Sequence, residues 1–421
     1  MRIQKGKLAA LLCAALLLPG CTFQSINNSG SGLSSQTQTP DSAQSGGDSS
    51  QGGGDESREE PTTEPENRKV RMVAVGDNLI QTAVLRAAQS YASDGTYDFR
   101  PCYENVKSYI QAGDVAVINQ ETLIANDEYE ITGSNFNFNS PTQVGEAILD
   151  AGFNVITVSN NHMLDKGVGG LTAAMNYWDN MRARNDITVV GAYRNKEDLE
   201  NIRIREVNGV KMAFLAFTEH TNGIPIPKDT EIQIILTSDT ETMKSQIRAA
   251  DAIADVVVVS VHWGVEDSFV VSDERREMAQ DFVDWGADVI LGTHTHTAET
   301  MEYLTREDGT QGFVFYSLGN FISAQTDSFN MLGEMADFDI IVDGQTGEVL
   351  ISDVKVIPVI THYDDGKLHN LRLYPYSMYT EELANSHGLP YAPLGTAKTF
   401  NMDVLNKYIQ DNIPVEFQKL D

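Results

Sequence analysis

The stretch from Gly292 to Thr297, GTHTHT, contains two histidines, a residue type that can bind metals or transfer protons. His294 and His296 stand one residue apart, directly after the apolar run ADVILG. Two imidazoles at the end of a strand are typical of a metal site, because neutral imidazole is a common metal ligand. They also occur in a polar turn that happens to contain two histidines. Other strand ends distinguish these two interpretations.

Residue types that bind metals also follow other apolar, strand-like runs. Open α/β sheets bring the carboxyl ends of their strands to one edge, where their binding sites lie. We therefore expect the ends of five such segments, far apart in the sequence, to converge. They are Asp77 after VAVG, Glu121 after VAVINQ, Asn160, Asn161 and His162 after VITVS, His262 after VVVVSV, and His294 with His296 after VILGT.

Each of these residues also has a structural interpretation when it is considered alone. Asp77 is typical of a turn or a helix N-cap, and Glu121 of a solvated loop. Asn160 and Asn161 are typical of a turn, and His262 of a hydrogen-bonded histidine at a strand end. Their occurrence together favours the metal interpretation.

The donor set indicates which metals to expect. Carboxylate and amide oxygens mixed with imidazole nitrogens suit Mn, Zn or Fe, whereas calcium sites use oxygens almost alone. Two such ions about 3.5 to 4 Å apart can activate water and hold the attacking and leaving oxygens of an in-line displacement. We therefore expect two divalent metal ions as cofactors. The predicted ligands are Asp77, Glu121, Asn161, His262, His294 and His296.

The elements that position these residues follow a βα pattern. Apolar runs of strand character alternate with segments of helical periodicity from residue 69 to residue 292. Asn208-Gly209, between two alternating runs, predicts a tight β-hairpin. Mostly strands are expected afterwards, in ETMEYL, GFVFYSLGNFIS, MADFDIIVD and GEVLISDVKVIPV. The pattern predicts an α/β fold in which two mixed sheets pack face to face with helices outside.

The N-terminus has the features of an export signal. Three basic residues precede LAALLCAALLL, a run too short for a permanent membrane helix. Cys21 follows Leu-Pro-Gly as in a bacterial lipobox, where the cysteine carries the lipid; the alternative is a buried cysteine of the signal peptide. We expect the protein to be exported and anchored as a lipoprotein to the outer face of the cell membrane.

Four segments follow from this pattern. Residues 1–21 are the predicted signal peptide, and residues 22–67 are a Ser/Gly/Gln-rich tether with too few apolar residues to repay the entropy of ordering. The main domain is expected over 68–360, and residues 361–421 form a less regular C-terminal extension, packed on that domain or appended to it.

The composition excludes one class of partner. The chain has 60 acidic residues against 30 Lys and Arg, a formal net charge of −30. Nucleic acid is held by clustered basic residues, so we expect no nucleic-acid partner. An anionic substrate must instead be met locally, and metal ions supply local positive charge. With Cys21 lipidated, Cys102 has no partner for an internal disulfide.

Across residues 70–324 the chain resembles the CapA family of poly-γ-glutamate capsule synthesis proteins, related to calcineurin-like metallophosphoesterases. The resemblance implies a four-layer α/β/β/α sandwich with a dinuclear metal centre. The motifs that carry it are VGD, NQE, SNNHMLDKG, VHWGVE, GTHTHT and YSLGNFIS.

The resemblance also implies residue roles. Asp77 matches the metal-binding aspartate of the first strand, Asn161 and His162 match the Asn-His pair, His262 matches the lone strand-end histidine, and His294 and His296 match the Gly-x-His-x-His ending. Three positions depart from the family pattern: Leu79 stands where the first motif has a histidine, Glu121 where many relatives have aspartate, and Thr295 where proline is common. The missing histidine removes one expected metal ligand.

For the reaction we expect hydrolysis with His162 protonating the leaving group, held by Asp165 three residues later. Asp165 is equally compatible with an acid at the start of the helix that follows Gly167. Asn160, Asn320 and His220 are the expected substrate-binding residues, although each is also typical of a turn or of the surroundings of a site.

Three functions are compatible with these features. The first is a surface-anchored metal-dependent hydrolase or transferase that acts on a phosphoester or amide in the synthesis, release or anchoring of an anionic exopolymer, poly-γ-glutamate by resemblance. The second is a non-catalytic capsule-assembly subunit that holds polymer or membrane-bound synthase subunits. The third is a secreted metallophosphatase or nucleotidase.

Overall fold

Two mixed β-sheets carry the predicted site residues in the computed structural model, which describes residues 65–421 except 126–127, 135–136 and 394. The predicted signal peptide, most of the tether and the predicted lipid-bearing Cys21 lie outside the described residues. Over the part of the chain that is described, no helix is long and apolar enough to cross a bilayer.

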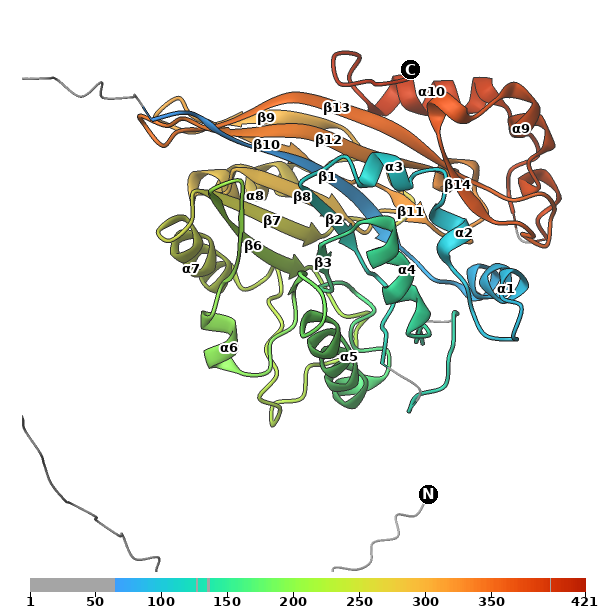
Figure 1. Ribbon diagram of the computed structural model, residues 1–421, viewed down its shortest axis with the longest axis horizontal. Coiled ribbons are helices and arrows are strands. Elements are labelled where there is room, and N and C mark those ends of the chain that lie inside the picture. Colours follow the sequence, from blue (N-terminus) through green and yellow to red (C-terminus); the bar gives the residue numbers. More distant parts are fainter. Residues whose placement is uncertain (1–64, 126–127, 135–136, 394) are drawn as a thin grey trace, which may run out of the picture. The chain divides into compact units, whose positions relative to one another are not determined.

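The first sheet has eight strands, seven of them in the order β14-β13-β12-β1-β2-β3-β4. β1 to β4 are parallel, while β12, β13 and β14 continue the sheet in antiparallel pairing. The short β11 pairs with β1 in parallel. Figure 1 shows the blue β1 beside the orange β12, with β13 on the far side of β12. The strands span β1 Arg68–Asn78, β2 Val115–Asn119, β3 Val155–Thr157, β4 Thr188–Val190, β11 Asn320–Ile322, β12 Leu332–Val342, β13 Val349–His362 and β14 Arg372–Pro375.

The second sheet has six strands in the order β5-β6-β7-β8-β10-β9. Its centre is parallel, and β5 and β9 are antiparallel edge strands. The predicted hairpin between β5 and β6 is confirmed: Asn208 and Gly209 both have positive φ, 52° and 76°, as a type I′ turn requires. The strands span β5 Arg203–Val207, β6 Val210–Thr218, β7 Val256–His262, β8 Val289–Thr293, β9 Met301–Thr305 and β10 Gln311–Phe315.

One apolar run that was expected within a series of strands serves both sheets. The segment GFVFYSLGNFIS forms β10 in the second sheet and β11 in the first. The chain passes between them through Gly319, whose φ is 64°. A Cβ atom at this position would lie only 2.9 to 3.1 Å from backbone atoms of residues 297 and 298, so a larger residue would clash. Periodicity alone does not reveal such a crossing, because both halves of the run are apolar.

Helices cover the outer faces of the two sheets. α5 packs near β4 and α2 near β14 of the first sheet, whereas α7 and α8 pack on strands of the second. A continuous buried core contains residues of both sheets, so the sheets pack face to face and the fold has four layers, α/β/β/α. The longer helices are α1 Thr82–Tyr91, α4 Gln143–Ala151, α5 Gly167–Arg182, α7 Thr240–Asp251, α8 Asp273–Asp284 and α10 Met402–Asn412; the short ones are α2 Arg100–Tyr103, α3 Lys107–Ile110, α6 Lys196–Glu200 and α9 Glu381–Ser386.

Local sequence explains why the central elements form. β2 and β7 consist largely of Val, Ile and Ala and are buried along their whole length, as expected of parallel strands covered on both faces. α7 and α8 begin where the side chains of Asp239 and Ser272 accept hydrogen bonds from the backbone N–H three residues later.

The C-terminal residues take part in the first sheet. β13 continues through His362, past the expected boundary at residue 360, and β14 pairs with it. The described residues belong to one unit that spans 62–421. The segment 361–421 therefore supplies an edge strand as well as α9 and α10.

Candidate metal centre

Strand register brings the predicted polar residues to one end of the paired sheets. Asp77 on β1 lies opposite Asn119 on β2 and Asn320 on β11, and His262 on β7 lies opposite Thr293 on β8. Because these strands run in parallel within each sheet, the loops that leave their carboxyl ends emerge together. The six predicted ligands meet there, and all are buried.

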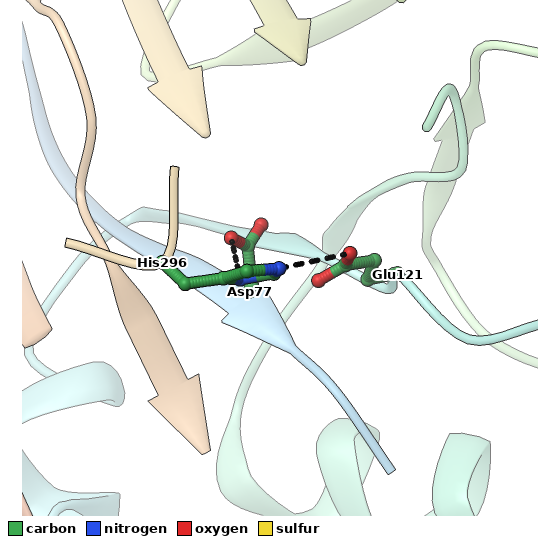
Figure 2. Close-up of side chains that lie close together, drawn as sticks. All are labelled: Asp77, Glu121 and His296. Carbon is green, nitrogen blue, oxygen red and sulfur yellow. Dashed lines mark ion pairs between the residues drawn. The ribbon is translucent and has the colours of Figure 1, made fainter. Parts of the chain in front are cut away.

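Asp77, Glu121 and His296 form the tightest group in this region (Figure 2). One ligand atom from each lies within 4.8 Å of the others. His296 Nδ1 is 3.2 Å from Asp77 Oδ2, and its Nε2 is 3.8 Å from Glu121 Oε1. The imidazole therefore stands between the two carboxylates, one at the end of β1 and the other two residues after the end of the adjacent β2.

A second group lies on another side of Glu121. His262 Nε2 is 3.0 Å from Asn161 Oδ1, 3.1 Å from His294 Nδ1 and 3.7 Å from Glu121 Oε1. Donor atoms about 3 Å apart are typical of ligands that share an ion at about 2.1 Å each. Glu121 is thus common to an Asp77/His296 group and an Asn161/His262/His294 group.

The surroundings of Glu121 show whether these residues suit a bound cation. Both oxygens of its carboxylate are buried and have no hydrogen-bond partner. Burial, with the nearby charge of Asp77, raises the pKa of Glu121 well above its ordinary value. Leaving a carboxylate buried without hydrogen bonds is costly, and a bound cation removes that cost. The mixture of carboxylate, amide and imidazole donors suits a divalent transition metal, so the residues fit a metal ion.

The histidines differ in their protonation. Burial, together with neighbouring histidines, lowers the pKa of His262 well below its ordinary value and that of His294 to about 2, so both rings are neutral and have a nitrogen lone pair available for a metal. Burial also acts to lower the pKa of His296, but Glu121 and Asp77 outweigh it and raise that pKa to about 10. Metal binding at His296 would therefore release a proton.

Backbone conformation at the GTHTHT stretch is unusual. His294 and His296 both have positive φ, 99° and 57°, which non-glycine residues seldom adopt. The backbone N–H of His294 donates to Asp77 Oδ2 at 3.2 Å. Such conformations cost about 1 to 3 kcal/mol each and occur mostly at functional sites. The strained backbone supports the metal interpretation over that of a simple polar turn.

Three residues that hold the ligands in place were not predicted as such. Asn119 Nδ2 donates to Asp77 Oδ1 at 2.7 Å and lies 3.3 Å from His262 Nδ1. Thr293 Oγ1 lies 2.9 Å from the same His262 nitrogen. Asn119 could have been found from the sequence because it lies two residues before Glu121, at the end of β2. Thr293 could have been found because it directly precedes His294. The third residue is Asn222.

The β6–α7 loop brings Asn222 against the Asn-His pair. Asn161 Nδ2 donates to Asn222 Oδ1 at 3.3 Å, and Asn222 Nδ2 lies 3.3 Å from His162 Nδ1. His220, in the same loop, lies with its ring centroid 5.0 Å from that of His294. His220 therefore borders the centre, as expected of a substrate-binding residue, whose role remains a prediction.

His162 and Asp165 are in direct contact. His162 Nδ1 is 2.8 Å from Asp165 Oδ2, and the backbone N–H of Phe138 donates to the same oxygen at 2.8 Å. His162 Nε2 faces the centre, 3.9 Å from Glu121 Oε1. α5 begins without a side-chain cap, so the alternative of Asp165 as a helix-capping acid does not describe this structure.

The other two expected substrate-binding residues make hydrogen bonds within the protein. Asn160 Oδ1 accepts from the His162 N–H at 3.0 Å, and Asn160 Nδ2 donates to the Gln120 carbonyl at 3.1 Å. Asn320 Oδ1 lies 3.1 Å from His296 Nδ1, and Asn320 Nδ2 donates to Gln325 at 2.7 Å. Both side chains thus orient the loops and ligands of the centre.

Leu79 stands at a position of the first motif where relatives have a ligand. It is buried, with its backbone N–H donating to the Ile322 carbonyl at 2.9 Å, and it offers no ligand atom. The Asp77/His296 group therefore has three candidate ligands including Glu121, while the other group has four.

Comparison with known proteins identifies relatives in capsule synthesis. The chain is 31% identical over 272 residues to the capsule biosynthesis protein CapA of Bacillus anthracis, a match that covers 63% of this chain and 62% of that protein. It is 30% identical over 254 residues to the PGA biosynthesis protein CapA of Bacillus subtilis, covering 60% and 62%. The chain thus spans about three fifths of the length of each of these curated relatives.

The solved structures that it resembles include a putative 5′-nucleotidase from Staphylococcus aureus, with a TM-score of 0.42, 13% identity, and 69% of this chain and 54% of that one covered. The family model described as bacterial capsule synthesis protein PGA_cap matches residues 71–325, which is more than half of the 421 residues. That span contains every side chain of the candidate centre, and the chain belongs to the PGA_cap family of bacterial capsule synthesis proteins.

Proposed function

We propose that this protein is a metal-dependent hydrolase or transferase acting on an anionic exopolymer of the poly-γ-glutamate type. The observation that carries the proposal is the carboxylate of Glu121, which is buried and has no hydrogen-bond partner, among the nitrogen and oxygen donors of five other predicted ligands. The Bacillus relatives are named for capsule and PGA biosynthesis, which supports the choice of polymer.

Two divalent ions of manganese, zinc or iron are the proposed cofactors. Asp77 and His296 would hold one ion, the group of Asn161, His262 and His294 would hold the other, and Glu121 would be shared. When bound, such ions supply Lewis-acid activation of water and of a scissile phosphoryl or carbonyl group. Positive charge at this point would also attract an anionic polymer to a chain whose net charge is −30.

His162 is the proposed general acid. Its Nδ1 lies 2.8 Å from Asp165 Oδ2, and the Phe138 ring packs nearly perpendicular to the imidazole, with 4.6 Å between the ring centroids. With Nδ1 held by Asp165, Nε2 is the nitrogen that faces Glu121, where it can deliver a proton to a leaving group. A positioned acid of this kind contributes about 10² to 10⁴ in rate.

Location and partners complete the proposal. Cys21 would anchor the protein to the outer face of the membrane through a lipid, after export. Membrane-bound capsule synthase subunits would then be within reach of the domain through the tether. The acidic composition argues against a nucleic-acid partner.

A non-catalytic capsule-assembly subunit is the second candidate, and Leu79 favours it. An apolar side chain in place of a ligand leaves the Asp77/His296 group with three protein donors. A centre with one filled position would stabilise the fold and hold polymer without turnover.

The test uses purified full-length protein loaded with manganese. Phosphodiester, nucleotide and γ-glutamyl substrates are offered to the native chain and to His162→Ala, with His369→Ala as the control because His369 is exposed and lies outside the centre. We expect His162→Ala to retain metal and to lose about 10²-fold or more of the turnover.

Other outcomes would change the assignment. Equal turnover by His162→Ala would remove it as the acid. If stripping the metal alters only the melting temperature and no substrate is turned over, the assembly subunit is the correct interpretation. Preferential turnover of nucleotides would indicate the nucleotidase.

A further inference from the structure

A separate pocket lies beside the candidate metal centre, against α5. Its volume is about 200 Å³, and Glu121 and Asn160 are among the residues that line it. α5 begins two residues after Asp165 and ends at Arg182, so its lining residues lead away from the centre. The pocket therefore adjoins the site at one end and reaches the last turn of α5 at the other.

The middle of the pocket is apolar. Aliphatic, thioether and indole groups from α5 face the ends of β2 and β3 there. A dry cavity of about 150 Å³ with such walls is enough to hold benzene, so this one has room for a short aliphatic segment. The apolar lining includes Leu123, Leu171, Ala174, Met175 and Trp178.

The outer part of the pocket is cationic in a strongly acidic chain. Arg182, Arg194 and Arg203 line the pocket together with Asp179 and Asp198; the third carboxylate of the lining, Glu121, belongs to the metal centre. Each arginine pairs with one of the two aspartates, which holds the guanidinium groups in place. A guanidinium has five N–H donors, so donors remain for a further anion.

Arg203, whose Nη1 donates to the carbonyls of Asp198 and Asn201 at 3.3 and 2.6 Å, also has one buried donor without a hydrogen-bond partner. Its side chain is 12% exposed, and Nη2 donates to Asp198 Oδ1 at 2.6 Å. Its Nε is buried and has no hydrogen-bond partner. Buried donors are seldom left unsatisfied, which favours an acceptor at this end of the pocket.

We infer that this pocket binds one aliphatic carboxylate unit of the anionic chain, with its methylene groups along the α5 wall and its carboxylate at the three arginines. The inference deepens the proposed function and rests on it. The pocket would select for a unit with both a short apolar stem and a negative charge, next to the metal centre.

Pentanoate is the probe, titrated into full-length protein and followed by ligand-observed NMR. Pentanamide has the same stem without charge, and acetate has the charge without the stem. We expect pentanoate to bind at least about tenfold more tightly than either, because charge-assisted hydrogen bonds and methylene burial each contribute about 1.5 kcal/mol or more. Equal binding of all three would overturn the proposal.

Two variants locate the binding. Ala174→Leu fills the apolar part without a change of charge, and Arg182→Gln removes one guanidinium whose side chain is 41% exposed and whose loss the fold should tolerate. Each should weaken pentanoate binding about tenfold. The matched control is Arg184→Gln, two residues further on and outside the pocket lining, which should bind like the native chain.

Unchanged affinity in both pocket variants would overturn the proposal, and should Ala174→Leu fail to fold, Arg182→Gln alone decides. Hydrolysis is assessed separately, by metal retention and by turnover with His162→Ala, and neither enters the pentanoate titration. The pocket and the proposed function can therefore fail independently.

Discussion

Two groups of buried histidines in this molecule differ in role: one belongs to the candidate metal centre and the other to the packed core. One surrounds Glu121 and includes His262, His294 and His296; the other is the pair His362 and His387 at the end of β13 and beyond α9. Burial lowers the pKa of His362 to about 4 and of His387 to about 3, much as it lowers the pKa of His294 to about 2. Burial and a lowered pKa therefore do not distinguish a site from a packed core.

Hydrogen-bond partners make the distinction. His387 Nδ1 accepts from the Leu389 N–H at 2.9 Å, and Nε2 lies 3.0 Å from the Thr361 carbonyl. His362 Nδ1 lies 2.8 Å from the Tyr379 hydroxyl. Around Glu121, by contrast, ring nitrogens face one another and a carboxylate that has no hydrogen-bond partner. The first arrangement is complete without a ligand, whereas the second is not.

The largest test of this contrast is Glu121→Gln. Loss of the shared carboxylate should lower manganese affinity by more than about 100-fold, since even residues that only support a ligand cost 10 to 100-fold. The metal-free variant should be about as stable as the native chain, because glutamine removes a buried charge that lacks hydrogen bonds but also removes a negative partner of His296. Metal analysis and thermal unfolding with and without manganese measure both effects. Retention of metal equal to that of an exposed control, Glu348→Gln, would contradict the assignment.

His387→Ala should act on stability alone. The substitution leaves a cavity between Tyr363 and Phe400, whose rings lie 4.4 Å from the imidazole, and unpairs two backbone groups. The free energy of unfolding should fall by about 3 kcal/mol, with metal content unchanged. Denaturant titration measures the first and elemental analysis the second. A loss of metal would show that the two histidine groups are not independent.

Thr293→Val should produce a smaller effect, on the metal only. It removes the hydroxyl that lies 2.9 Å from His262 Nδ1, so the imidazole is less firmly oriented and manganese affinity should fall about tenfold. Thr293→Ser, which keeps the hydroxyl, is the control and should retain the native affinity. The same affinity for both variants would mean that this contact does not orient the ligand.

The smallest expected effect concerns pH. The folded pKa of His362 lies near 4, below the ordinary value of about 6.5, so between these values the unfolded chain binds more protons than the folded one. Its stabilising contribution is present above about pH 6.5 and is lost as the pH falls toward 4. In His362→Phe the drop in unfolding free energy between pH 7 and pH 5.5 should be about 1 kcal/mol smaller than in the native chain. Denaturant titrations at the two pH values, with His369→Gln as an exposed control, test this, and an unchanged drop would contradict it.

Much of the candidate centre was predictable because its ligands follow strands of strong local character. Asp77, Glu121 and His262 each end an apolar run, and parallel strands bring such ends together whatever the lengths and sequences of the connecting loops. The hairpin at Asn208-Gly209 was predictable for a similar reason, since two positive φ values suit few other residue pairs.

Other features depend on distances between sheets and loops. Asp165 contacts His162, and Asn222 approaches Asn161. Both contacts depend on the direction of the side chains, which the spacing of residues in the sequence does not determine. The division of GFVFYSLGNFIS between two sheets was equally hidden, because β10 and β11 are apolar alike.

The sequence by itself determined which residue types could bind metal and which strands would present them, because strand character and strand ends are local properties. Only the tertiary structure decided that Glu121 stands between two ligand groups, that Asp165 contacts His162, and that the apolar face of α5 covers a pocket with arginines at its outer end. These properties are set by how two sheets and one helix pack against one another, and packing depends on all the contacting side chains together.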